Sequence, residues 1–440
     1  MDLLGNLGQE DQLLSTRAEN KVLQEKVKEL TVRVHALKCE NEALKAEVEI
    51  YRGDANFLRS TGGVGDNNNV FGESKEVDDG ADHFVTSGDG IYPSDAAVTL
   101  PNIHGNTNPL CCALHSDDAL LATGGADSNI KLCRWGVALA PGDESSVKAV
   151  NQSITIPCGA PVICCSFAQV GQGKRLAVVG AGCMDGSVKL SHGSSLDDLD
   201  QPNVDRLLKS DNDIKHKKYV KTICWSPTES ILASASADGT IQLTKIGFVD
   251  KEKSTVSLEV LKSMHFDGAV ESMCFVNGDT LCCYVRGTSY LSYFDLNDDY
   301  KQTKVSINGR STGTECFDEH VSFAVLSLTP SPCGSYIALA TDAGRNIIME
   351  SGTDKIVRNL YGHKNDGFSN AKIAWSKSGQ YLYGNSQDTK HIIVWDIASE
   401  SIVKELDAGG FVRDLYSSNN SDTLVSVSFD KTAKIWLRDM

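Results

Sequence analysis

An internal repeat constrains the fold of this chain more than any other feature of its sequence. The clearest copy runs from Gly362 to Ile397 and contains "AKIAWS", "YLYGNSQD" and "HIIVWD". These runs predict three short β-strands, with a tight turn between the first two and an Asp-containing turn before the third. Six further copies begin at Leu110, Val162, Val220, Val270, Ala324 and Val412. The repeat therefore predicts an all-β architecture of seven similar units.

The spacing of the turn Asp residues indicates how large each unit is. Successive turns lie between 42 residues (Asp388 to Asp430) and 58 residues (Asp127 to Asp185) apart. Such steps suit a blade of four strands and are too long for leucine-rich or helical repeats. In the fourth copy Arg286-Gly287 stands at the Asp position. The remaining turn Asp residues are Asp238 and Asp342.

These motifs resemble the WD-repeat family of β-propellers, over roughly residues 96–440. The dipeptide that names the family stands at Trp395-Asp396 and is degenerate in the other copies. The resemblance implies a seven-bladed WD-repeat β-propeller that acts as a scaffold for protein–protein interactions. It also implies a hydrogen-bonded structural tetrad of a loop His, a strand Ser, the turn Asp and a strand Trp. The matching residues are His363, Ser386, Asp388 and Trp395.

The seventh copy is one strand short of a four-stranded blade. Its third strand is Ala433–Trp436, and the sequence then ends at Met440. An open blade would expose strand edges, a hazard that closure of the ring removes. The unassigned strand-like run Ala96–Leu100 precedes the first copy, so we predict that it pairs with Ala433–Trp436. His104, which follows that run, is expected to act as a blade-start His.

The N-terminal part of the chain has a different period. Leu and Val recur with heptad spacing, which predicts a parallel coiled coil over residues 13–52 after a tail of residues 1–12. Asn20 and Asn41 fall at core positions, where a buried Asn pair can fix the register of a dimer. We therefore expect a homodimer. The alternatives are an amphipathic helix on the chain's own globular part and a coil with a different chain.

Between the coil and the repeats the sequence is rich in Gly, Asn, Ser and Asp. Residues 53–95 include "TGGVGDNNNVFGESKEVDDGADH". A segment of this composition cannot bury enough apolar surface to offset its conformational entropy. We predict a flexible acidic linker over residues 53–95, followed by the propeller over residues 96–440.

Charge and composition limit the classes of partner and the location. A net charge of −16 opposes a nucleic-acid-binding surface, because phosphate contacts would work against that field. No run approaches 18 apolar residues, so no membrane span or membrane partner is expected. Fourteen Cys without a signal peptide indicate a reducing compartment. We expect a cytoplasmic protein, and the nucleus and cilium stay open.

The sequence contains no motif that indicates catalysis. H-E-x-x-H, G-x-S-x-G and the phosphate-binding loop are all missing, and no Cys pair forms C-x-x-C. The three adjacent Cys pairs should point to opposite faces of their strands, which does not suit a metal chelate. We therefore expect no enzyme, no metal and no cofactor. An enzyme that uses the central pocket of a propeller is the rival interpretation.

Two loop sets suggest binding faces. Alignment of the first-strand starts places cations and apolar side chains near the top entrance of the ring, where they predict a protein- or peptide-binding site. Three acidic connections, at 140–146, 194–203 and 296–302, predict a negative bottom face, with ordinary solvated loop charge as the alternative. The top-face candidates are Lys221, Lys372, Arg413, Phe411, Phe429 and Met184.

The function predicted from these features is that of a dimeric scaffold. The alternative is a fixed subunit of an axonemal, spliceosomal or ubiquitin-ligase assembly.

Overall fold

The computed structural model describes most of the repeat region. The described residues are 84, 86–116, 118, 120–135, 153–168, 177–193, 207–210, 213–250, 255–308, 323–364 and 370–438. They all belong to one compact unit, Asp82–Met440. The predicted tail, the coiled coil with Asn20 and Asn41, and the linker up to residue 83 lie outside the described residues. So do the acidic connections 140–146 and 194–203.

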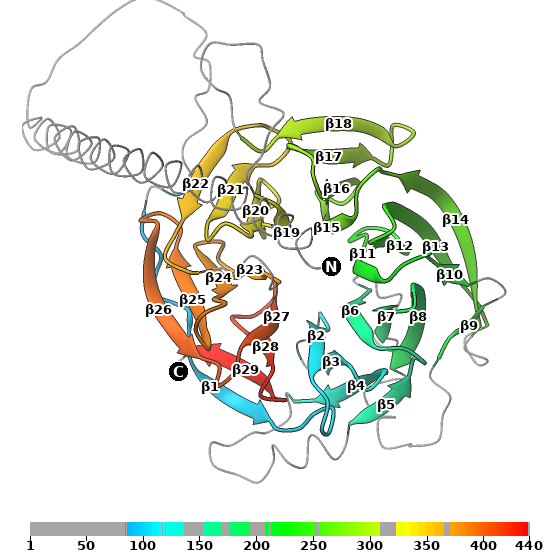
Figure 1. Ribbon diagram of the computed structural model, residues 1–440, viewed down its shortest axis with the longest axis horizontal. Helices are drawn as coiled ribbons and strands as arrows, with labels where there is room; N and C mark the ends of the chain where they lie inside the picture. The colour runs from blue at the N-terminus through cyan, green and yellow to red at the C-terminus, as the bar shows by residue number, and fades with distance from the viewer. Residues whose placement is uncertain are drawn as a thin grey trace, which may run out of the picture. The chain divides into compact units, whose positions relative to one another are not determined.

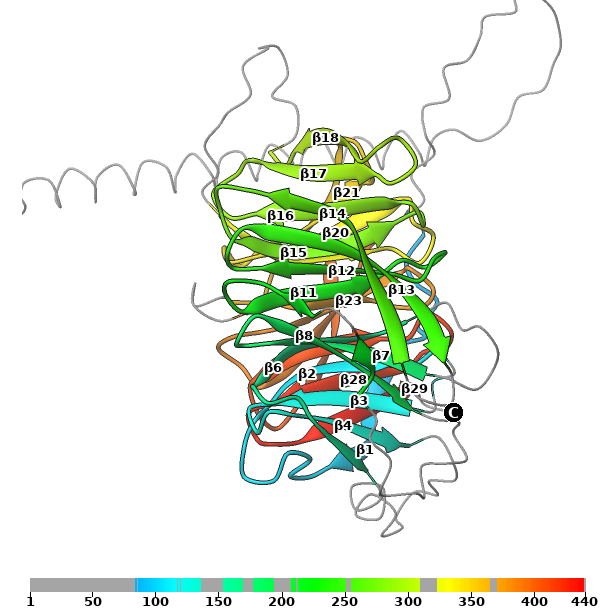
Figure 2. The same ribbon diagram turned by 90° about the vertical axis from the view of Figure 1, so that its right-hand side faces the viewer.

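The described residues form seven antiparallel blades around a common axis, with the first strand of each repeat innermost (Figure 1). In Figure 2 the same blades are seen from the side, with their inner strands crossing the ring from one face to the other. The seven-bladed, all-β propeller predicted from the repeats is confirmed.

Each blade runs from an inner strand a to an outer strand d. Blade 1 consists of β2 (Pro109–Leu114), β3 (Leu120–Gly125), β4 (Asn129–Arg134) and β5 (Ile154–Pro157). Blade 2 consists of β6 (Val162–Phe167), β7 (Ala177–Cys183), β8 (Ser187–Gly193) and β10 (Ile214–Lys215). Blade 3 consists of β11 (Val220–Trp225), β12 (Ile231–Ser236), β13 (Thr240–Asp250) and β14 (Thr255–His265), with β9 (Lys209–Ser210) added in parallel to β14.

Blades 4 to 7 continue in the same order. Blade 4 consists of β15 (Val270–Val276), β16 (Thr280–Val285), β17 (Tyr290–Asp295) and β18 (Lys301–Ser306), and blade 5 of β19 (Val325–Pro330), β20 (Tyr336–Thr341), β21 (Asn346–Glu350) and β22 (Ile356–Leu360). Blade 6 consists of β23 (Ile373–Trp375), β24 (Tyr381–Asn385), β25 (His391–Asp396) and β26 (Ser401–Asp407). Blade 7 consists of β27 (Val412–Ser417), β28 (Leu424–Ser428), β29 (Ala433–Arg438) and β1 (Pro93–Leu100).

Burial explains the composition of these strands. The second strands β3, β12 and β20 are buried along their whole length, because neighbouring blades cover both of their faces. They are accordingly continuous runs of small and aliphatic residues, such as "ILASAS" and "YIALAT", and do not alternate. The outer strands β18 and β26 are mostly exposed and carry "KQTKVS" and "SIVKELD". The core is therefore a ring of contacts between blades.

The ring is closed by β1, which lies antiparallel to β29 as the outer strand of blade 7. Ala96 is opposite Trp436, and Leu100 is opposite Ala433. Leu100 is 0% exposed and packs with side chains of blades 7 and 1. β1 starts at Pro93, three residues before the run that the sequence suggested, at a strand end where proline is tolerated.

A segment ahead of β1 is bound to the ring, and this corrects the predicted extent of the flexible linker. We call Phe84 and residues 86–92 the N-terminal strap. Gly88 N donates to Asp396 Oδ1 (3.2 Å), and Gly90 N donates to the Tyr381 hydroxyl (2.6 Å). Gly88 is required by this approach, because a Cβ there would lie 2.2 Å from the Tyr381 hydroxyl oxygen.

Aromatic side chains explain why the strap is ordered. The Phe84 ring is buried against Tyr336, with 4.8 Å between the ring centroids, and the Arg358 guanidinium lies 5.8 Å from its centroid. Tyr92 makes an edge contact with Tyr381 at 5.1 Å. The linker was predicted from the average composition of residues 53–95, which gave no weight to the single aromatic residues Phe84 and Tyr92. The linker prediction is therefore wrong for the residues of the strap and for the first residues of β1.

Candidate functional site

The top face of the ring is the end at which the inner strands begin. There, in six blades, an amide of the turn between strands b and c donates to a carbonyl at the start of strand a, so the two loops are held together. These bonds join Ala126 to Asn108, Met184 to Pro161, Ala237 to Tyr219, Arg286 to Ala269, Asp342 to Ala324, and Phe429 to Phe411, at 2.9–3.1 Å.

Four large apolar side chains are exposed on the loops that these six bonds join. Phe411 (43% exposed) and Phe429 (46%) belong to the same bonded pair in blade 7. Met184 (53%) is in the turn of blade 2, and Tyr219 (37%) precedes β11 of blade 3. We call these residues the top-face apolar set. Three were sequence candidates. Tyr219 was missed, although it stands directly before a strand a, as Phe411 does.

Met184 and Tyr219 lie on neighbouring loops. Gly186, in the turn that follows Met184, has φ +84°, and a Cβ there would lie 2.4 Å from His216 O and 2.7 Å from Lys218 O. Only glycine allows this approach of the blade 2 turn to the loop before β11. The backbone therefore brings Met184 close to the loop that carries Tyr219.

The structure corrects the role predicted for Lys221. Its Nζ forms an ion pair with Glu271 Oε2, and Glu271 Oε1 also accepts from Arg286 Nε at 2.7 Å. The hydrogen bond to Glu271 raises the pKa of Arg286. Glu271 is buried, and the Lys221 side chain is only 19% exposed. Lys221 therefore neutralises a carboxylate of the channel wall and is not a free cation at the entrance.

Lys372 is also tied to an acid. Its Nζ lies 3.4 Å from Asp414 Oδ1, and Asp414 Oδ2 accepts from Cys112 N at 3.0 Å. We call these three residues the Asp414 junction. Burial by itself lowers the pKa of Lys372, but Asp414 outweighs it and the pKa is raised. Lys372 is thus a structural cation.

A shift of one residue explains this second correction. Because Trp375 and Trp225 end their inner strands in the same way, Lys372 corresponds to Thr222 and not to Lys221. Arg413 is the remaining candidate cation. It is partly exposed, and no ion pair of Arg413 is found among the described residues.

The predicted tetrad of blade 6 is not formed as a continuous chain. Trp395 Nε1 donates to Tyr361 O (2.7 Å), and Ser386 Oγ donates to Asp388 Oδ1 (2.8 Å). His363 makes an edge contact with the Trp395 ring at 5.3 Å, but neither of its ring nitrogens has a hydrogen-bond partner among the described residues.

The physical reason is that Asp388 is too exposed to need the histidine. Its side chain pairs with Lys364 at 3.1 Å, and the Ser386 hydroxyl and Lys364 lower its pKa. Burial lowers the pKa of His363 to about 4, so this ring is neutral near pH 7. His363 and Asp388 therefore make no hydrogen bond with each other.

Histidine networks are complete in two other blades. His104 Nδ1 donates to Asp127 Oδ1 (2.9 Å), which leaves Nε2 to accept from Thr123 Oγ1 (3.0 Å). His216 Nδ1 donates to Thr240 Oγ1 (2.7 Å), which in turn donates to Asp238 Oδ1 (2.6 Å). Burial lowers the pKa of both histidines. These buried networks hold the top loops and are structural.

The other turn Asp residues are satisfied locally. Asp185 accepts from the amide (3.0 Å) and hydroxyl (2.7 Å) of Ser187, and Asp430 accepts from the same two groups of Thr432 at 3.0 and 2.7 Å. Asp342 accepts from Ala324 N at 2.7 Å. Their role is to fix the turns that carry the exposed side chains of the top face.

The described residues can also be tested for two other roles, metal ligation and membrane insertion. In that part of the chain, no group of three or more His, Cys, Asp or Glu is placed to hold a metal ion. No helix there is long and apolar enough to cross a membrane.

Comparison with known families agrees with this architecture. The family described as WD domain, G-beta repeat matches residues 98–133, 211–244 and 401–436. Each match starts at the outer strand of one blade and continues through the first three strands of the next blade, which is blade 1, blade 3 or blade 7. A comparison with curated proteins found no match. WD-repeat propellers are in general protein-interaction scaffolds and not enzymes. The matched repeats and the ring of seven blades identify this chain as a WD-repeat β-propeller.

Proposed function

We propose that this chain is a non-enzymatic scaffold whose top face binds a protein partner. The top-face apolar set is the observation that carries the proposal. Aromatic and Met side chains are enriched at the centres of protein interfaces, and here they project from loops that are fixed by backbone hydrogen bonds. Fixed loops lose little entropy on binding. Arg413, which follows Phe411 by two residues, supplies a cation beside the apolar contacts.

The test is to compare partners recovered with the wild-type chain and with a Phe411→Ala, Phe429→Ala double variant, by cross-linking and quantitative mass spectrometry. Truncation of interface anchors costs about 2 kcal/mol each, so recovery should fall more than tenfold. The matched control is Ile402→Ala with Val403→Ala, which removes apolar side chains of similar exposure from the outer strand β26. Equal loss with both pairs, or no loss with either, would contradict the proposal.

We also propose that two such propellers are joined through the coiled coil of residues 13–52. Support comes from the heptads and from Asn20 and Asn41, which suit a self-paired core. Two linked propellers would turn weak contacts into avidity. Sedimentation of the full chain should give twice the 47.4 kDa chain mass, and Leu30→Pro with Leu37→Pro should give the single mass. A monomeric wild-type chain would instead favour a fixed subunit of an axonemal, spliceosomal or ubiquitin-ligase type of assembly.

The chemistry of the cysteines supports a cytoplasmic location for this scaffold. Twelve Cys of the described residues are free thiols, and nine of these are buried. Burial raises the pKa of several of them, Cys133 to about 12, so they are unreactive packing residues. Such a set is stable in a reducing compartment.

A further inference from the structure

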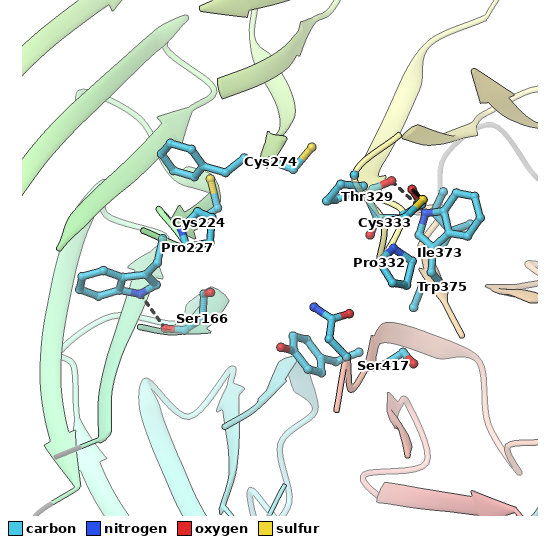
Figure 3. Close-up of a pocket in the computed structure, with 18 of the residues that line it drawn as sticks. Ser166, Cys224, Pro227, Cys274, Thr329, Pro332, Cys333, Ile373, Trp375 and Ser417 are labelled. Atoms are coloured by element: carbon cyan, nitrogen blue, oxygen red, sulfur yellow. Dashed lines mark hydrogen bonds between the residues drawn. The ribbon is translucent and has the colours of Figure 1, made fainter. Parts of the chain in front are cut away.

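The bottom face of the ring contains a cavity of about 510 Å³ at the end of the central channel. It lies where the inner strands of blades 2 to 7 end and their following loops begin (Figure 3). Aromatic side chains contribute to its wall, and they are Phe167, Trp225, Phe275, Trp375 and Tyr416. Its volume falls within the range of roughly 300–1,000 Å³ that is typical of ligand pockets.

Two tryptophans make this wall rigid. Trp225 Nε1 donates to Ser166 O (3.1 Å) of the preceding blade, and Trp375 Nε1 donates to Thr329 O (3.0 Å) of its own preceding blade. Figure 3 shows the two bonds on opposite sides of the cavity. Each indole therefore joins neighbouring inner strands and has its polar atom satisfied. The cavity is formed before anything binds, which lowers the cost of binding.

The charge around the cavity is distributed unevenly. No Asp, Glu, Lys, Arg or His is among the residues that line it. Carboxylates stand on the adjoining loops instead, since Glu229 follows the lining residue Pro227 and Asp279 follows Gly278. Neither has an ion pair among the residues that the structure describes, and the exposed Asp299 of the next loop adds a third carboxylate. The rim on the side of blades 3 and 4 is therefore acidic.

Tyr300 lies near two of these rim carboxylates, Asp299 and Glu229. Burial raises the pKa of its hydroxyl, and the negative charges of Asp299 and Glu229 raise it further. Asp279 is oriented by Thr228 Oγ1 (3.1 Å) and Asn297 Nδ2 (3.0 Å), both neutral donors that leave its charge uncompensated. Lys262 Nζ lies 5.1 Å from the centroid of the Tyr300 ring, so an approaching cation meets the free carboxylates chiefly at Glu229 and Asp279.

We propose that the bottom cavity receives an apolar side chain from a basic segment of a partner protein, whose Lys or Arg residues contact Glu229 and Asp279. A wall that carries no charged side chain and is formed in part by aromatic residues suits an uncharged side chain, and it would leave a buried charge unpaired. The acidic rim selects cationic neighbours and repels acidic ones. This site is separate from the top face, so the scaffold has a second binding surface with its own partner chemistry.

The probe is a fluorescein-labelled peptide, Gly-Arg-Lys-Trp-Lys-Arg-Gly, whose binding to the full chain is measured by fluorescence anisotropy at low salt. We expect saturable binding. Replacement of the peptide's Trp by Ser should weaken binding at least tenfold, because the apolar anchor is lost. Replacement of its four basic residues by Glu should abolish binding. No saturable binding of the basic peptide, or equal binding of all three peptides, would overturn the proposal.

Variants locate the site on the ring. Cys333 is an exposed residue that lines the cavity, so Cys333→Trp should lower the affinity for the basic peptide at least tenfold. Ser116 is on an exposed bottom loop and does not line the cavity, so Ser116→Trp should not change that affinity. Glu229→Lys should weaken it about threefold, and the matched reversal Glu259→Lys on β14 should have no effect. All four positions are exposed, so circular dichroism should show unchanged folds. Equal effects within either pair would overturn the proposal.

Discussion

Leu100→Asp is expected to open the ring and abolish cooperative unfolding, whereas Ala97→Asp on the same strand should leave the thermal transition close to that of the wild type. Leu100 is fully buried beside Val98, Ile103 and Ile435, and Ala97 is exposed. A carboxylate at position 100 loses the packing of the leucine and has no partner for its charge, which together cost more than about 4 kcal/mol. Circular dichroism melts and limited proteolysis measure the difference.

Two deletions separate ring closure from the N-terminal region. Removal of residues 84–104 takes away the N-terminal strap and β1, and leaves β29 as an open edge. We expect that protein to aggregate or to lose its cooperative transition. Removal of residues 1–59 touches none of these contacts and should not change the melting temperature of the propeller. If the variant that lacks residues 84–104 unfolds at the same temperature and as cooperatively as the wild type, closure of the ring by β1 is refuted.

Asp414→Ala is expected to destabilise the protein by about 3 kcal/mol. Asp414 is buried in β27 of blade 7, and its two oxygens hold Cys112 N of blade 1 and Lys372 of blade 6. Its removal leaves a buried amide and a largely covered ammonium without their acceptor. Urea denaturation followed by tryptophan fluorescence gives the change in the free energy of unfolding.

The control for Asp414 is Asp430→Ala, which removes an exposed turn carboxylate from the same blade and should cost about 1 kcal/mol or less. Because the pKa of Lys372 is raised in the folded state, the stabilisation from its pair with Asp414 is complete at neutral pH. On the alkaline side it should be lost as the pH rises through that raised value. A double variant Lys372→Met, Asp414→Ala that is less stable by the full sum of the single effects would show that the pair is not coupled.

The repeat pattern was sufficient to predict the architecture because its signals are local. Each copy carries its own strands and turns, and "ILASAS" of blade 3 and "YIALAT" of blade 5 have the continuous small and aliphatic character of strands covered on both faces. The lack of a fourth strand after Ala433–Trp436 also pointed to Ala96–Leu100, since a ring has no free edge to leave unpaired. The structure places that run opposite β29.

The candidate site was predicted less completely. Phe411, Phe429 and Met184 are exposed on the top loops, as their positions before strand a or the turn Asp suggested. Lys221 and Lys372 are instead neutralised by acids from the neighbouring blades. The cation could be located on its own strand, but the acid that faces it comes from another repeat, at a distance set by the register of two inner strands.

The number of blades, their strands and turns, and the strand that closes the ring could be predicted from the amino-acid sequence, because those features depend on short-range patterns and on the need to pair every edge. The folded ring was needed to learn which histidines join a network, how far the N-terminal strap is ordered, and where the cavity between Trp225 and Trp375 lies. Each of these depends on contacts between repeats. Contacts of that kind are fixed by the packing of whole blades against one another, which no single copy of the repeat encodes.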